Sequence, residues 1–200
     1  MCHAFLYDAR FHEALRRLDH AMAAEVQAGG CPFCGGSLHR GDYPRKPRAL
    51  RSALSQEDSR RLSLCCAREG CRRRCTPPSV RFLGRKVYLG LIIALASALS
   101  GGLSSKRRAW LCEQLAIPAQ TLWRWQGWWR TVVPQSTWWG QLRGELMPPV
   151  RAESLPGGLL ERLQGADLPR RLRRLLWLLR PLTTTSWTGT LRAGSVPQKM

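Results

Sequence analysis

Six of the eight cysteines fall between residues 31 and 75, and this clustering constrains the fold more than any other feature of the chain. The stretch opens with Cys-Pro-Phe-Cys-Gly-Gly at residues 31–36. Two cysteines separated by two residues and followed by glycines are typical of a tight knuckle that presents thiolates to a metal ion. A tetrahedral zinc site needs a second thiolate pair, and the chain offers four candidates, Cys65, Cys66, Cys71 and Cys75.

We predict a zinc ribbon over residues 31–80 that binds Zn²⁺ through four ligands, Cys31, Cys34, Cys66 and Cys71. The second pair stays open at this point, since Cys65 or Cys75 could replace one of its members. Four thiolates leave no open coordination position, so the zinc is expected to be structural. The first ten residues lack the pattern of a secretory signal, and cysteines at ligand spacing then fit reduced thiolates in the cytoplasm better than disulfides.

The chain carries 32 Lys and Arg against 13 Asp and Glu, a formal net charge of +19. An excess of this size lies on the surface and usually meets a polyanion, most often nucleic acid, with an anionic membrane as the competing partner. Residues 87–103 number 17, carry no charge and include serines and glycines, so they fall short of the ~20 apolar residues of a membrane span. We therefore expect a buried helix there, no membrane partner, and nucleic acid as the polyanion.

Hydrophobic periodicity predicts a mainly α fold with a small β zinc ribbon. An apolar stripe from Phe11 to Val26 indicates a helix over residues 8–27, which packs against the chain's own core or against a second copy in a homodimer. Short strands are expected in the ribbon and a long apolar helix over residues 86–100. The expected segments are an N-terminal amphipathic helix (1–30), the zinc ribbon (31–80), a helix-turn-helix domain (81–134), a Pro/Gly-rich connection with C-terminal basic helices (135–182) and a flexible tail (183–200).

The helix-turn-helix prediction rests on two helical patterns, residues 105–117 and 121–133, which are separated by a turn at Pro118. The second helix would present four side chains that can reach base edges, Gln120, Thr121, Arg124 and Gln126. Basic side chains suited to phosphate contacts precede it in two clusters: Lys106, Arg107 and Arg108, and, just after the ribbon, Arg72, Arg73, Arg74, Arg81, Arg85 and Lys86. The alternative is a helical hairpin with a solvated basic face. The tryptophans of residues 123–129 either stack on a partner or pack the C-terminal helices, and we favour packing.

Catalytic patterns are missing from the sequence. The acidic residues are few and scattered, and no nucleophile elbow, phosphate-binding glycine loop or His-Glu-x-x-His occurs. We therefore expect a binding protein and not an enzyme.

The motifs CPFCGG, GCRRR and TLWRW, spread over residues 31–133, resemble the N-terminal DNA-binding part of bacterial insertion-sequence transposases. The resemblance implies a zinc ribbon followed by a helix-turn-helix, with the four selected cysteines as ligands and Arg124 as a DNA contact. The acidic catalytic domain that follows in those enzymes is missing. This implies a non-catalytic accessory factor or regulator of mobile-element origin, whose partners are DNA and a recombinase or transposase. Two alternatives remain: an RNA-binding or ribosome-associated zinc-ribbon protein, and a transposase or nuclease with carboxylates that the motifs do not reveal.

Overall fold

The computed structural model describes residues 4–50, 54–84 and 86–184. Arg85 and residues 185–200, which include most of the expected tail, lie outside the described part. The chain forms two compact units, the first made of residues 1–89 and 177–200 and the second of residues 90–176. The described residues are mainly helical with a small antiparallel sheet, which confirms the predicted fold class in this coarse form.

The first unit is built on α1 (Ala9–Ala28), which follows the short 3₁₀ helix η1 (Ala4–Tyr7). The carboxylate of Asp8 caps α1 by accepting from the amide of Arg10, and Gly29 is its C-cap, so the helix lies within one residue of the predicted range 8–27 at each end. The apolar stripe is buried at Leu15, Met22 and Val26. Two polar side chains, His12 and Asp19, are buried on the same helix.

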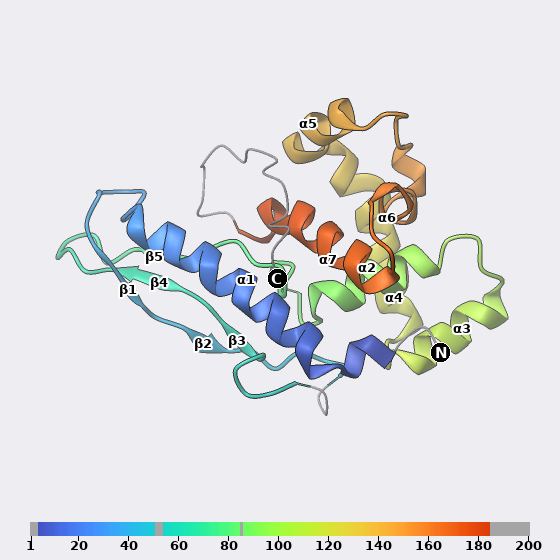
Figure 1. The fold of residues 1–200 in the computed structure, drawn as a ribbon, viewed down its shortest axis with the longest axis horizontal. Coiled ribbons are helices and arrows are strands. Elements are labelled where there is room, and N and C mark those ends of the chain that lie inside the picture. Colours follow the sequence, from blue (N-terminus) through green and yellow to red (C-terminus); the bar gives the residue numbers. More distant parts are fainter. Residues whose placement is uncertain (1–3, 51–53, 85, 185–200) are drawn as a thin grey trace. The chain divides into compact units, whose positions relative to one another are not determined.

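The strands of the first unit are short. β1 (Leu38–Arg40), β4 (Leu64–Cys66) and β5 (Arg74–Cys75) form one antiparallel sheet in the order β1-β4-β5, with β4 in the centre. β2 (Tyr43–Pro44) and β3 (Arg60–Arg61) form a second antiparallel pair. α1 lies alongside these strands (Figure 1), and the side-chain amide of Gln27 donates to the carbonyl of Leu38. The helix and the ribbon therefore share one core.

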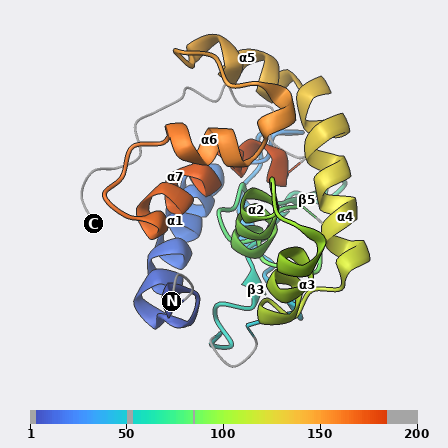
Figure 2. The same ribbon diagram turned by 90° about the vertical axis from the view of Figure 1, so that its right-hand side faces the viewer.

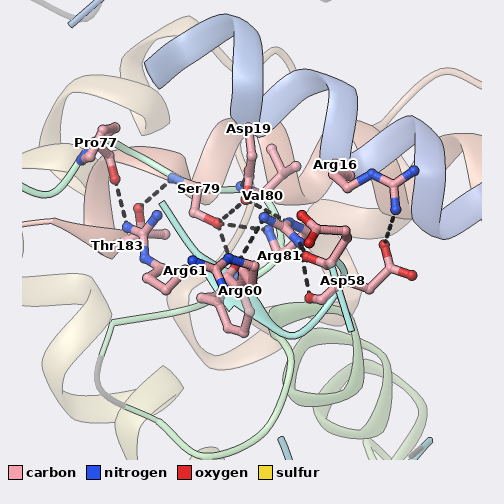
Figure 3. Close-up of polar contacts among 12 residues, drawn as sticks. Arg16, Asp19, Asp58, Arg60, Arg61, Pro77, Ser79, Val80, Arg81 and Thr183 are labelled. Atoms are coloured by element: carbon pink, nitrogen blue, oxygen red, sulfur yellow. Dashed lines mark hydrogen bonds and ion pairs between the residues drawn. The ribbon is translucent and has the colours of Figure 1, made fainter. Parts of the chain in front are cut away.

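A buried ion pair connects α1 to the segment after the ribbon (Figure 3). The Asp19 carboxylate accepts from the Ser79 hydroxyl at 2.6 Å, the Val80 amide at 2.7 Å and the Arg81 Nε at 2.8 Å. Arg81 also donates to the carbonyl oxygens of three residues of the preceding loop and β3, Glu57, Asp58 and Arg60. The expectation that Arg81 belongs to a basic surface cluster is therefore wrong, because the side chain is buried and used in folding.

The C-terminal part of the first unit is joined to the same region. The Thr183 hydroxyl accepts from the Ser79 amide at 2.9 Å, and the Thr184 hydroxyl donates to the Thr76 carbonyl at 2.6 Å. Thr183 ends the 3₁₀ helix η6 (Arg180–Thr183). Nearby, Arg61 donates to the Pro77 carbonyl (Figure 3). The segments at residues 76–79 and 183–184, which are far apart in the sequence, thus lie side by side.

The second unit is helical (Figure 2). Its elements are α2 (Gly90–Leu99), α3 (Ser105–Gln114), α4 (Ala119–Gly127), the π-helical turn η3 (Trp128–Val132), η4 (Val133–Gln135), α5 (Thr137–Glu145), η5 (Ala152–Ser154), α6 (Gly157–Arg162) and most of α7 (Leu168–Leu179). α2 is its central buried helix, and α4 packs against it. No helix of the described residues is long and apolar enough to cross a membrane.

Two helices of the second unit differ from the sequence prediction. α2 begins at Gly90 and not near residue 86, because Tyr88 and Leu89 form β-bridges with Arg48 and Phe82. α5 forms inside the stretch that was expected to be a Pro/Gly-rich connection. The hydroxyl of Ser136 caps it by accepting from the amide of Trp139.

Candidate metal centre and basic surface

Four cysteine sulfurs of the first unit lie within 4.8 Å of one another, those of Cys31, Cys34, Cys66 and Cys71. The Sγ atoms of Cys31 and Cys71 are 3.8 Å apart, and those of Cys34 and Cys66 are 3.4 Å apart. The structure thus brings together the quartet that the sequence analysis selected. Cys65 and Cys75 stay outside it: Cys65 is on the opposite face of β4 from Cys66, and Cys75 is fully buried in β5.

The first knuckle is held by its own backbone. The Cys31 carbonyl accepts from the amides of Cys34 at 3.3 Å and Gly35 at 2.8 Å, and the Cys31 amide donates to the Gly36 carbonyl at 2.8 Å. Gly35 has a φ of +69°, which an L side chain would strain. Glycine at this position therefore lets the chain turn tightly enough to bring the two sulfurs to one side.

The second knuckle repeats this arrangement. The Arg68 carbonyl accepts from the amides of Cys71 and Arg72 at 3.1 and 3.2 Å, and Gly70 has a φ of +82°. Arg68 also joins the two knuckles, because its guanidinium donates to the Cys34 carbonyl at 3.0 Å. The two halves of the site are thus fixed to each other without a direct sulfur–sulfur bond.

Backbone amides lower the pKa values of the Cys34 and Cys66 thiols, whereas burial raises them. A hydrogen bond from the Gly36 amide is the main reason that the pKa of Cys34 is lowered to about 7. Burial raises the pKa of Cys66 to about 12, although the Arg68 amide partly opposes this effect. A cation among the four sulfurs would stabilise the thiolate form of all of them, since thiol ligands bind metal in the deprotonated state.

The geometry fits a tetrahedral thiolate site. Zn–S bonds of about 2.3 Å place the sulfurs of a tetrahedron about 3.8 Å apart, which lies inside the observed range of 3.4 to 4.8 Å. A disulfide would need about 2.05 Å. Gly36 forms part of the wall: a Cβ there would lie 3.4 Å from the sulfurs of both Cys34 and Cys66. The four cysteines could therefore hold one metal ion in a close-fitting cradle.

The arginine triplet beyond the second knuckle is exposed at all three positions. Arg73 lies over the ring of Phe33, with its guanidinium carbon 4.8 Å from the ring centroid. Arg74 donates to the Gly41 carbonyl and the Ser63 hydroxyl. Arg72, which directly follows Cys71, has a φ of +45°. Two members of the predicted phosphate-binding cluster thus also brace the ribbon.

In the second unit, α3 and α4 are joined by a short turn. Ala116 in this turn has a φ of +50°, and the Ile117 amide reaches back to the Cys112 carbonyl at 2.8 Å, which is the Schellman pattern of a helix C-terminus. Leu111 and Leu115 are buried together with Ile117. The Ser104 hydroxyl caps the start of α3. The turn thus fixes the angle at which α4 leaves α3.

The predicted nucleic-acid contacts of this unit divide into two groups. Four are exposed and accessible, Lys106, Arg107, Gln120 and Arg124. Three are used inside the protein. Thr121 is buried, and its hydroxyl accepts from Arg124 at 3.3 Å, so its prediction as a base contact is wrong. Arg108 and Gln126 are half-buried: Arg108 donates to the Leu103 carbonyl at 3.2 Å, and Gln126 donates to the Ser100 hydroxyl at 2.8 Å.

Two exposed tryptophans were not expected. Trp125 and Trp129 are buried, as predicted for packing residues, but Trp123 is 72% exposed and Trp110 is 56% exposed. Helical periodicity could have predicted that Trp123 is exposed. Leu122 and Trp125 are three residues apart and share the buried face, whereas Trp123 lies off that face. The prediction that the tryptophans of residues 123–129 pack as one group is therefore too coarse, because Trp123 is exposed.

The carboxylates of the second unit, all of which the structure describes, form no group of three within metal-ligand distance. Among the described residues, the thiol quartet is the cluster of three or more metal-type ligands that lie within ligand distance. Glu153 and Glu161 line a cavity of about 370 Å³ beside Arg130, and Glu145 is exposed at the end of α5. Comparisons with known protein families, curated proteins and solved structures give no match for this chain.

Proposed function

We propose that this protein is a zinc-containing DNA-binding protein that reads duplex DNA with α4. The observation that carries the proposal is the set of polar and basic side chains that are exposed on α3 and α4. Gln120 is exposed in the first turn of α4 and Arg124 is exposed one helical turn later, and Lys106 and Arg107 are exposed in the first turn of α3. Glutamine and arginine suit adenine and guanine edges, and the basic pair suits the phosphates of the same groove.

The metal in this proposal is Zn²⁺, which prefers four thiolates in a tetrahedron. Its role is structural, because the quartet leaves no position for a substrate. The four cysteines hold the ion, and their knuckles orient the exposed arginines beside them. Arg72 then serves as a phosphate contact in the first unit, with Arg73 held ready by its contact with Phe33.

The DNA test compares two arginine variants on specific and random duplexes. Arg124→Ala is expected to relax sequence preference by about tenfold, since a bidentate base contact contributes roughly 1–3 kcal/mol of discrimination. Arg162→Ala, which removes an exposed arginine from α6, is the matched control and should leave the preference unchanged. Equal losses for both variants, or RNA binding as tight as DNA binding across a salt series, would refute reading by α4.

The metal test compares two cysteines that are 31 residues apart in sequence, Cys34 inside the quartet and Cys65 outside it. Cys34→Ser should abolish stoichiometric zinc in elemental analysis of the reduced protein. Cys65→Ser should retain it. A wild-type protein that is purified without chelators and contains no zinc would overturn the metal assignment.

The resemblance to insertion-sequence transposases supports a more specific role. A DNA-binding protein of this kind, whose 200 residues carry no catalytic motif, would act as an accessory factor or regulator beside a separate recombinase or transposase. A plasmid-nicking assay with Mg²⁺ tests this role. No nicking is expected, whereas nicking that disappears in Glu145→Ala or Glu153→Ala would establish an enzyme instead.

A further inference from the structure

Trp123 is the most unusual side chain on the outer face of α4. It is 72% exposed, although an indole is among the side chains that gain most from burial. The neighbouring positions explain why it is outside the core: Leu122 and Trp125 face inward and are buried. Trp123 is thus presented by a helix that is packed on its other side.

The surroundings of Trp123 indicate the charge of its partner. Residues 119–135 contain Arg124 and Arg130 but no acidic residue. Gln120 lies one turn before Trp123, and Arg124 follows it directly, both exposed. A second basic protein surface, such as another copy of this chain, would bring like charges together here. A polyanion fits this face better.

The indole of Trp123 cannot recognise base edges as Gln120 and Arg124 can. Its single N–H donor gives it little ability to distinguish base edges, but its flat face stacks on the face of a base. In a paired duplex the base faces are covered by neighbouring bases, so an indole beside the groove finds no stacking surface. A base that is unpaired or lies at a duplex end exposes such a face.

We propose that Trp123 stacks on an unpaired base, so that α4 recognises DNA at a junction between duplex and single strand. Gln120 and Arg124 contact the last paired bases, and the indole covers the first unpaired one. This inference rests on the proposed DNA-binding function and specifies the class of substrate that the same surface takes.

The test uses three DNA ligands of the same base composition: a blunt duplex, a duplex with a short single-stranded tail, and the single strand alone. The wild type is expected to bind the tailed duplex about tenfold more tightly than the blunt duplex, within the range measured for single aromatic–base stacks. Trp123→Ala should reduce the ratio of the two affinities to about one, and Trp123→Phe should keep most of it, because phenylalanine still stacks.

Trp110→Ala is the matched control, since it removes an indole from α3 that is also exposed. It should leave the affinity ratio as in the wild type. A spectroscopic readout separates stacking from folding. Stacking quenches indole emission, so the quenching caused by the tailed duplex should be largely absent from Trp123→Phe and retained in Trp110→Ala.

The inference is overturned if Trp123→Ala keeps the preference for the tailed duplex, if Trp110→Ala loses it equally, or if the wild type shows no preference. In each of these cases the protein still binds DNA and the proposed function stands. Failure to bind any of the three ligands would instead refute the proposed function. A concentration-dependent dimer that Trp123→Ala abolishes would show that the indole contacts a second copy.

Discussion

The buried pair of Asp19 and Arg81 allows the sharpest prediction about stability. The side chains are 1% and 3% exposed, so neither charge has access to water. Asp19→Ala removes the carboxylate and leaves the Arg81 guanidinium buried with only carbonyl oxygens as partners. It also leaves the Val80 amide without its acceptor.

The expected loss is about 3–5 kcal/mol, the cost of breaking a buried ion pair by removing one partner. This is a large part of the 5–15 kcal/mol that stabilises a typical domain. Asp19→Asn should lose less, because the amide oxygen still accepts from Val80 or Ser79. The double variant Asp19→Ala/Arg81→Met should be more stable than Asp19→Ala alone, since it removes the uncompensated charge.

Urea unfolding followed by circular dichroism measures the loss, and hydrogen exchange locates it. Exchange should accelerate in α1 and in residues 79–82. Glu13→Ala is the matched control, because Glu13 pairs with Arg17 on the same helix but both side chains are exposed. An exposed pair of this spacing contributes only about 0.3–0.5 kcal/mol. If Asp19→Ala costs no more than Glu13→Ala, the buried pair does not stabilise the first unit as argued.

Three further predictions concern single positions. Gly36→Ala places a Cβ 3.4 Å from two sulfurs of the quartet and 3.2 Å from the Arg68 Cβ. The affinity for zinc, measured by competition with a chelator, should therefore fall about tenfold. Unchanged affinity would argue against the close-fitting cradle. Ala116→Gly relieves a φ of +50° and should stabilise the protein by about 1 kcal/mol in thermal unfolding, whereas a destabilised variant would contradict the strain. Burial raises the pKa of the Cys75 thiol. In the zinc-loaded protein, iodoacetamide at about pH 8 should therefore label the half-buried Cys65 before Cys75. The opposite order in peptide mass spectrometry would be inconsistent with the fold.

Local sequence patterns were sufficient to predict those parts of the structure that local interactions determine. The start and end of α1 follow from Asp8 and Gly29, because a side-chain cap and a helix-ending glycine act within one turn. The choice of Cys66 over Cys65 follows from the alternation of side chains along β4, which turns Cys65 away from the other sulfurs. Both features depend on residues close together in the sequence.

Interactions between segments that are far apart in the chain could not be predicted from local sequence patterns. Asp19 lies four residues after Leu15 and three before Met22, so the helical period itself places it on the buried face. Its partner Arg81 is 62 residues away, and no pattern links the two. Arg81 was therefore expected in a basic surface cluster. The late start of α2 has the same origin, because bridges to Arg48 and Phe82 hold Tyr88 and Leu89 extended.

The missed helix α5 shows a different limit. Its signals were present, with Ser136 as a cap and Trp138, Trp139 and Leu142 at helical spacing, and all three apolar side chains are buried. The prolines and glycines on both sides of these signals led to the prediction of a connection in place of a helix. A cap and an apolar face identified the helix more reliably than the overall composition did.

The first unit is made of two stretches that are far apart in the sequence. Residues 1–89 and 177–200 form it, and residues 90–176, which form the second unit, lie between these stretches in the sequence. Within the first unit, Leu89 bridges to Phe82, and Thr183 and Thr184 bond to Ser79 and Thr76. The four cysteines that could hold a metal ion belong to this same unit. Because the ribbon carries no chemistry in the proposed function, bound zinc is expected to act by stabilising the fold of the first unit.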